Sequence, residues 1–180
     1  MQQALPPPAK AEANLAAPGQ YLIFVLGAES YGVPVLTVRA IERLPEITPV
    51  PQMPDYITGV INLRGRVIPV MDLRIRFRLS RAELHERTLI MVVDVRFDGG
   101  SSSLVGLIVD AVEGVSLLAE ADIGEPPNFG GKLNTDYITG MAKVKGQVKV
   151  LLDVDRLVTA ETLSLVQENT QPTANLQGAA

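Results

Sequence analysis

The chain contains one five-residue motif twice. Asp-Tyr-Ile-Thr-Gly occupies residues 55–59 and returns unchanged at residues 136–140, an offset of 81. Aligning 55–73 with 136–154 gives eight identities in nineteen positions, where chance gives roughly one. A second match, at an offset of 74, pairs Gly32 and Val38 with Gly106 and Val112. We therefore expect two similar halves, with function at the seam between them and at the positions where they differ.

Short runs of Val, Ile and Leu, separated by Gly, Pro and polar turns, fill both halves. Such a pattern is typical of many short strands. We predict strands at six of these runs: 21–26, 31–35, 59–63, 66–71, 89–93 and 104–109. With about five strands in each half, the sequence predicts a mostly β chain that forms two small barrels.

Helical segments are expected only after the last strand of each half. Residues 72–79 and 153–158 have a spacing compatible with a helical turn. A terminal helix is expected to end at residue 167, with Asp153 or Asp155 as its N-cap. Residues 1–19 and 168–180 show no apolar period, so we expect both to be mobile tails.

Composition narrows the class of protein. An apolar content of 47% in 180 residues is enough for a core in each half. A net charge of −4 counts against a nucleic-acid protein, although seven arginines between residues 64 and 87 keep a nucleic-acid-binding barrel as a remote alternative. The sequence has no cysteine, no signal-peptide pattern and no apolar run of eighteen residues, which favours a soluble protein of the cytoplasm.

No local motif for catalysis is present. His85 is the only histidine and lies in a polar linker, Glu120 and Asp122 are ordinary surface acids, and the glycine pairs at 99–100 and 130–131 do not open a phosphate-binding helix. Aromatic residues make up only 4% of the chain and are scattered along it. We therefore expect a binding module without catalytic residues, metal or cofactor, whose surplus aliphatic surface suits a partner helix.

Residues 59–74, Gly-Val-Ile-Asn-Leu-Arg-Gly-Arg-Val-Ile-Pro-Val-Met-Asp-Leu-Arg, preceded by Ile-Thr-Pro-Val-Pro at 47–51, closely resemble the hallmark of CheW, the family of bacterial chemotaxis coupling proteins. The likeness extends from about residue 20 to residue 158. It implies two intertwined SH3-like barrels of five strands, at about 20–79 and 88–158, followed by a terminal helix at 159–167.

The resemblance also implies a function. A CheW-like chain is a noncatalytic adaptor that couples the tips of methyl-accepting chemoreceptors to the regulatory domain of a CheA-type histidine kinase. It is cytoplasmic, associates with the inner membrane only through receptor arrays, and can contact other CheW-like domains. A coupler for another chemosensory output, such as twitching pili, is the near alternative.

Site residues follow from the same resemblance. The kinase-facing positions are Leu22, Val35 and Val38, with barrel core as their alternative location. The receptor groove corresponds to Ile61, Leu89, Val109, Val112 and Val115, for which core is equally open. Phe129 matches a ring contact, although Gly124 and Asn128 stand where some relatives have charged residues.

Arg64 belongs to the receptor-binding set as well. It resembles an arginine that pairs with a glutamate in many relatives, but this chain has Ala40 at the glutamate position. Either Arg64 pairs with Glu42 or another acid, or it is free to meet a carboxylate on a partner. We expect a role in binding, because an exposed ion pair stabilises a fold by only about 0–1 kcal/mol.

Overall fold

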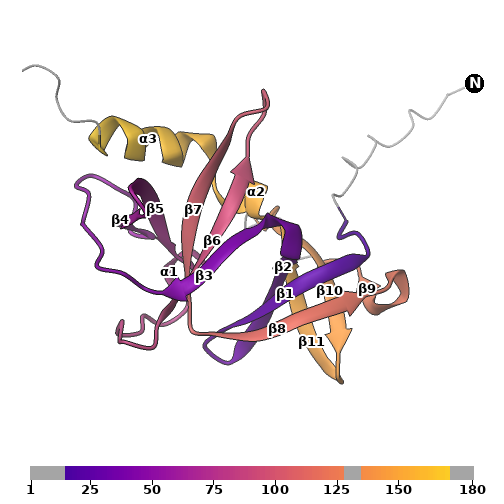
Figure 1. The fold of residues 1–180 in the computed structure, drawn as a ribbon. Helices are drawn as coiled ribbons and strands as arrows, with labels where there is room; N and C mark the ends of the chain where they lie inside the picture. Colours follow the sequence, from indigo (N-terminus) through magenta and orange to yellow (C-terminus); the bar gives the residue numbers. More distant parts are fainter. Residues whose placement is uncertain (1–14, 128–134, 171–180) are drawn as a thin grey trace, which may run out of the picture.

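The computed structural model describes residues 15–127 and 135–170, which form two β-sheets joined face to face (Figure 1). The six-stranded sheet has the order β8 (Ala111–Leu118), β1 (Gly19–Leu26), β2 (Glu29–Pro34), β11 (Gln147–Leu152), β10 (Ile138–Val144), β9 (Ile123–Gly124). The five-stranded sheet has the order β3 (Val38–Arg43), β6 (Leu89–Arg96), β7 (Ser102–Val109), β5 (Arg66–Asp72), β4 (Ile57–Leu63). The prediction of a mostly β fold is confirmed, and sheets of five and six strands stand where two barrels of about five strands each were expected.

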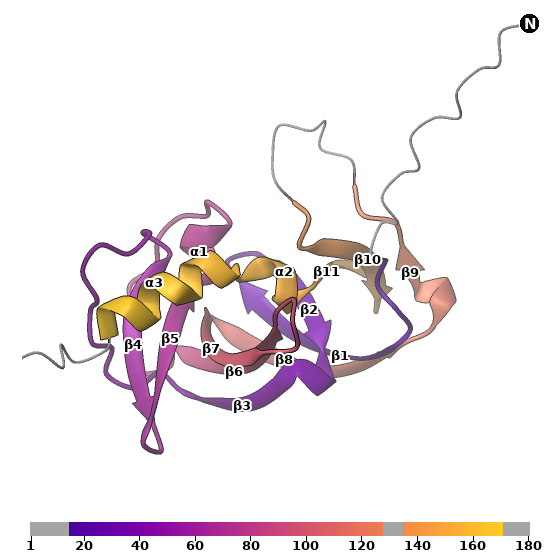
Figure 2. The ribbon, with the colours of Figure 1, turned by 90° about the horizontal axis from the view of Figure 1, so that it is seen from above.

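The two halves of the sequence exchange hairpins. The β1–β2 hairpin comes from the first half but pairs with β8 and, in parallel, with β11 of the second half. In return, the β6–β7 hairpin of the second half pairs with β3 and, in parallel, with β5 of the first. This exchange agrees with the intertwining that the resemblance implied, because the halves at about 20–79 and 88–158 each contribute strands to both sheets (Figure 2).

The repeated segment forms the same hairpin in both sheets. In each copy the pairing skips one residue near the start of the strand, between Ile57 and Gly59 in one and between Ile138 and Gly140 in the other. The turn residues also agree, since Arg64-Gly65 have φ of 52° and 82° and Lys145-Gly146 have 49° and 79°. Two consecutive positive φ values give the tight turn that matches strand twist, and glycine in the second position adopts it without strain.

The spacing from the motif to the following aspartate is the same in both repeats, and it too has a structural cause. Asp72 and Asp153 end their hairpins, and each carboxylate accepts a hydrogen bond from the backbone N–H two residues later, at 2.9 Å in both copies. These bonds cap the short helices α1 (Leu73–Arg76) and α2 (Val154–Leu157). The two helical turns predicted from sequence are therefore present.

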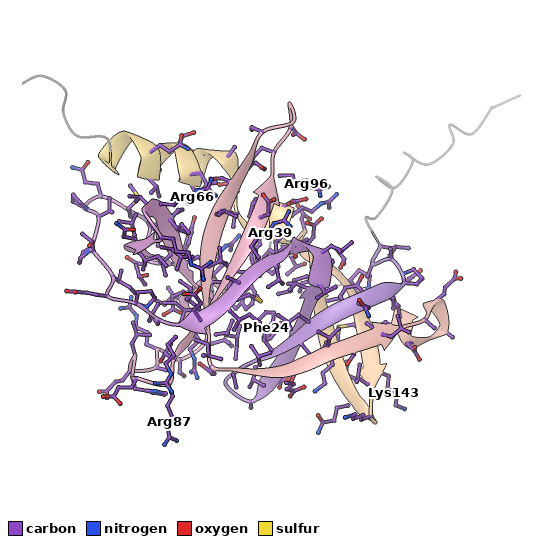
Figure 3. The ribbon with its side chains drawn as sticks, viewed as in Figure 1. Phe24, Arg39, Arg66, Arg87, Arg96 and Lys143 are labelled. Atoms are coloured by element: carbon purple, nitrogen blue, oxygen red, sulfur yellow. The ribbon has the colours of Figure 1, made fainter. Side chains whose placement is uncertain are left out.

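The largest core lies between the two sheets rather than inside either one. It joins Leu22 and Phe24 of the six-stranded sheet with Met91 and Val93 of the five-stranded sheet, and Phe24 is fully buried at the centre of the molecule (Figure 3). Two smaller clusters fill the individual sheets. Because the shared core is the largest, the halves form one folding unit.

The terminal helix begins one residue after the start at 159 that the resemblance implied, and later than a cap at Asp153 or Asp155 would require. Asp153 caps α2, while α3 runs from Ala160 to Thr170 and starts after Thr159, whose side-chain oxygen accepts a bond from the backbone N–H of Thr162 at 3.2 Å. The prediction of Asp153 or Asp155 as its cap is wrong, because the chain turns between the two helices. Leu163 and Val166 of α3 are buried in the shared core.

The expected tails are shorter within the described residues. Gly19 already belongs to β1, and the backbone N–H of Ala16 donates to the carbonyl oxygen of Thr139 at 3.0 Å. At the other end, the helix continues through residues 168–170. The rest of both segments, 1–14 and 171–180, lies outside the described residues. In the part that the structure describes, no helix is long and apolar enough to cross a membrane.

The remaining elements are two 3-10 turns, η1 (Val35–Thr37) and η2 (Glu120–Asp122). The first connects β2 of one sheet to β3 of the other, and the second connects β8 to β9. The segment 31–35 was predicted to be strand throughout, but the strand ends at Pro34, and the 3-10 turn begins at Val35. This turn carries the chain from one sheet to the other.

Candidate functional site

Five of the residues predicted for binding gather at the seam between the sheets. Leu22 and Val109 are members of the shared core, and Val38, Leu89 and Val112 pack against it while remaining partly exposed. The strands that carry Val38 and Val112 are β3 and β8, which are the edge strands of their sheets. Both lie away from α3 (Figure 1). Because Val38 and Val112 remain partly exposed on these strands, the seam reaches the surface of the molecule there.

The most exposed of the predicted apolar residues is Val115. Its side chain lies beside that of buried Leu22 across the β1–β8 pair, and 53% of Val115 is exposed. Ile41, its counterpart at an offset of 74, occupies the matching place on β3 and is 39% exposed. We call the set Val38, Ile41, Val112 and Val115 the seam surface.

Three of the residues that were predicted to bind a partner are buried in this structure. Leu22 is 5% exposed, Ile61 is 1% exposed and Val109 is fully buried. Leu22 and Val109 belong to the shared core, and Ile61 belongs to the core of the five-stranded sheet. Their location agrees with the alternative that the sequence left open, and we exclude them from the proposed contact surfaces.

The two most exposed large apolar side chains of the described body were not among the predicted residues. Leu36, in η1, is 83% exposed, and Leu117, on β8, is 76% exposed. Leu36 lies between the predicted residues Val35 and Val38, so it extends the kinase-facing set. Its exposure could not be predicted from the sequence. The run from 31 to 35 predicted a strand, and nothing indicated the 3-10 turn that follows it and contains Leu36.

Arg64 pairs with Glu42, as one of the two alternatives drawn from the sequence proposed. Its guanidinium Nη2 lies 3.2 Å from Glu42 Oε1, which takes the place of the glutamate missing at Ala40. The Arg64 side chain is 83% exposed, so water screens this ion pair. The pair orients Arg64 without using up its hydrogen-bonding capacity. Phe129, predicted as a ring contact, lies outside the described residues.

Two other ion pairs cross between strands near the edges. Arg39 Nη2 lies 2.8 Å from Asp94 Oδ2, and this hydrogen bond holds the pKa of Asp94 below its ordinary value. In the six-stranded sheet, Lys149 Nζ lies 3.1 Å from Glu113 Oε2 and lowers the pKa of Glu113, with help from a bond donated by Ser30. Only Lys149 of these residues is buried, at 4% exposure.

Other polar side chains of the described residues gather in a pocket and around His85. A pocket of about 750 Å³ between α2 and the β6–β7 turn is lined by charges of both signs, including Arg76, Arg156 and Asp155. Among the described residues, no group of three His, Asp or Glu side chains is placed to hold a metal ion. The exposed His85 accepts a bond at Nδ1 from the backbone N–H of Arg87, whose side chain projects away from the body (Figure 3).

Comparison with known proteins identifies the fold and its relatives. A solved structure of the scaffolding protein TtCheW from Thermoanaerobacter tengcongensis superposes with a TM-score of 0.70 at 31% identity, covering 81% of this chain and 96% of that one. The chemotaxis protein CheW of Klebsiella aerogenes is 34% identical over 82% of this chain and 86% of its own length.

Relatives from other bacteria extend this result. The chemotaxis protein CheW of Rhizobium meliloti is 32% identical over 82% of this chain and 93% of that protein. Protein FrzA of Myxococcus xanthus is also 32% identical, over 80% of this chain and 87% of its own. The model of the CheW-like domain matches residues 20–162. With a family match over most of its length and relatives above 30% identity, this chain belongs to the CheW-like domain family.

Proposed function

We propose that this chain is a noncatalytic adaptor that couples the cytoplasmic tips of methyl-accepting chemoreceptors to the regulatory domain of a CheA-type histidine kinase. The observation that carries this proposal is the apolar seam surface on two edge strands from different sheets. An adaptor must hold two partners at once, and exposed aliphatic side chains on an open seam suit contacts with helices and with small barrels.

The two partners divide the surface between them. The kinase regulatory domain would contact Val35, Leu36 and Val38, which lie where β2 passes into β3. The receptor tip would contact Val112, Val115 and Leu89, with Leu117 extending the same strand and Arg64 offering a charge at the rim. Exposure supports both contact sets, because Leu36 in the first is 83% exposed, and Leu117 and Val115 in the second are 76% and 53% exposed.

A pull-down with separate baits tests both surfaces. Receptor tips and the kinase regulatory domain should each retain the wild-type chain. Leu36→Asp should lose the kinase domain and keep the receptor tip, while Val115→Asp should do the reverse, because a buried unpaired carboxylate opposes each contact. Failure of the wild-type chain to bind either bait would reject the proposal, and loss of both baits in each variant would reject the division.

A coupler for another chemosensory output is the near alternative. The chain is 32% identical both to Protein FrzA of Myxococcus xanthus and to the chemotaxis protein CheW of Rhizobium meliloti, so identity does not separate the outputs. The same adaptor surfaces would then serve a receptor and a kinase of a pathway that does not drive flagella. Binding the chain to kinases from each pathway present in its source organism would separate the two outputs.

A further inference from the structure

Four of the aromatic residues, scattered in sequence, form a continuous column between the sheets. Phe24 and Tyr31 stack with ring centroids 5.9 Å apart, Tyr31 and Phe77 lie 5.3 Å apart, and Phe77 and Tyr137 stack at 5.3 Å with 18° between their planes. Phe24 and Tyr31 belong to the six-stranded sheet, and Tyr137 precedes β10 of the same sheet. Phe77 follows α1 and the five-stranded sheet, so it inserts between two rings of the opposite sheet.

Arg76 completes the column at the point where the two sequence repeats meet. Its guanidinium carbon lies 5.2 Å from the ring centroid of Tyr137 and 5.4 Å from that of Tyr56. These tyrosines are the same residue of the repeated motif, at positions 56 and 137. A cation over two ring faces is attracted to both, so Arg76 links one sheet's motif to the other's.

The position of Arg76 can be filled only once. A side chain that is nearly equidistant from two equivalent tyrosines lies midway between the repeats, where a second copy of itself would collide with it. At an offset of 81, the counterparts of Arg76 and Phe77 are Leu157 and Val158, both buried at 1% exposure. The second repeat therefore supplies aliphatic packing where the first supplies the cation and the ring.

The terminal helix holds the far end of the column. The hydroxyl groups of Tyr56 and Thr162 lie 3.3 Å apart, and Thr162 belongs to α3 and is buried. The chain reaches α3 directly from α2, which follows the six-stranded sheet. The contact therefore ties the end of the six-stranded half to the motif of the five-stranded sheet.

We propose that Arg76 is a positioning residue that fixes the angle between the two sheets, by holding Tyr56 and Tyr137 on either side of its guanidinium. Neither tyrosine belongs to the seam surface, so Arg76 would act on partner binding through the geometry of the sheets. Its role in coupling rests on the proposed adaptor function, because both partners must be held in one arrangement. The angle itself is a property of the isolated chain.

Distances between spin labels test this role without any partner. The chain has no cysteine, so Arg66→Cys and Gln147→Cys provide two exposed labelling sites, one at the same repeat position in each sheet. The wild-type background should give one narrow distance distribution. Arg76→Leu should at least double its width, whereas Arg81→Leu, which removes an equally positive charge from the exposed linker, should leave it unchanged.

Two further variants distinguish positioning from simple stability. Tyr137→Phe keeps the ring and should keep the narrow distribution, while Arg76→Lys keeps the charge but cannot present a planar group to both rings and should broaden it. If Arg76→Leu does not fold, Arg76→Lys decides the question. An unchanged distribution in a folded Arg76 variant would overturn the proposal, even if that variant melts earlier. That result would leave the adaptor function untouched, since the pull-down tests it separately.

Discussion

Arg74 and Asp110 form an ion pair with two hydrogen bonds, at the point where the chain passes from β7 of one sheet to β8 of the other. Arg74 Nε donates to Asp110 Oδ1 at 2.9 Å, Nη2 donates to Oδ2, and the side chains are only 19% and 27% exposed. Asp110 also accepts a bond from the backbone N–H of Gly27 at 2.6 Å, and its own N–H donates to Val25. One aspartate thus ties α1, the β1–β2 turn and the β7–β8 crossover together.

We predict that Arg74→Ala lowers the free energy of unfolding by about 2 kcal/mol, because hydrogen bonds to charged groups are stronger than neutral ones and the remaining carboxylate stays partly buried. Urea denaturation followed by circular dichroism measures the change. A loss below about 0.5 kcal/mol would mean that water replaces the arginine at no cost.

Arg64→Ala also removes an ion pair, but this pair is exposed, whereas that of Arg74 is partly buried. Since Arg64 is 83% exposed and its pair with Glu42 is screened, we predict a loss of stability of about 0–1 kcal/mol. Binding to receptor tips should weaken, and titration calorimetry would measure it. The opposite pattern, a large drop in melting temperature with unchanged affinity for receptor and kinase, would make Arg64 a purely structural residue.

Gly59→Ala should be far more damaging than another glycine change in the same hairpin. A Cβ at Gly59 would lie 2.2 Å from the carbonyl oxygen of Thr48, and its φ of +148° already disfavours a side chain. We predict a loss of about 3 kcal/mol or more. At Gly65 nothing lies within 4 Å, so Gly65→Ala should cost only the strain of its positive φ, about 1–2 kcal/mol.

Thermal melts of both glycine variants, run side by side, measure this difference. Equal destabilisation would indicate that the loop around Thr48 moves aside without cost. The comparison also bears on the repeat, because a Cβ at Gly140 would lie 2.9 Å from the carbonyl oxygen of Gly124 in the equivalent place. Glycine recurs in the motif because a neighbouring backbone approaches it closely in both sheets.

Lys149→Met should make the free energy of unfolding less dependent on pH in the acid range. Lys149 lowers the pKa of Glu113 in the folded state, so the pair contributes stability above the ordinary glutamate value of 4.5, and this contribution is lost as the pH falls through the lowered pKa. Without Lys149 that loss becomes smaller, because the largest cause of the lowered pKa is gone while the Ser30 hydrogen bond remains. Urea midpoints between neutral pH and pH of about 3 measure it, and parallel profiles for variant and wild type would contradict the assignment.

Much of the fold could be predicted because local signals agree with it. The Arg64-Gly65 and Lys145-Gly146 turns and the capping carboxylates of Asp72 and Asp153 depend on neighbours in sequence. The exchange of hairpins could not be predicted from such signals, since it depends on the parallel pairing of β2 with β11 and of β7 with β5. The cap of α3 was missed for a related reason, because Asp153 caps the shorter α2 instead.

The candidate site was predicted less completely than the fold. Internal symmetry made Val38 equivalent to Val112, but apolar type alone does not separate a seam residue such as Val115 from a core residue such as Val109. Burial depends on which strand lies at a sheet edge, and that is a tertiary property. The aromatic column could not be predicted from the sequence for the same reason, since Phe77 contacts Tyr137 only when the two sheets pack together.

The measurement that tests the adaptor function most directly is a kinase assay that combines receptor, CheA-type kinase and this chain. Wild-type protein should make autophosphorylation respond to receptor ligand, whereas Val115→Asp should reduce that response at least tenfold without unfolding. The matched control is Val148→Asp, because Val148 is 55% exposed, against 53% for Val115, and lies three strands away in the same sheet. It should couple normally. Full coupling by folded Val115→Asp, or no ligand response with the wild-type chain, would contradict the account.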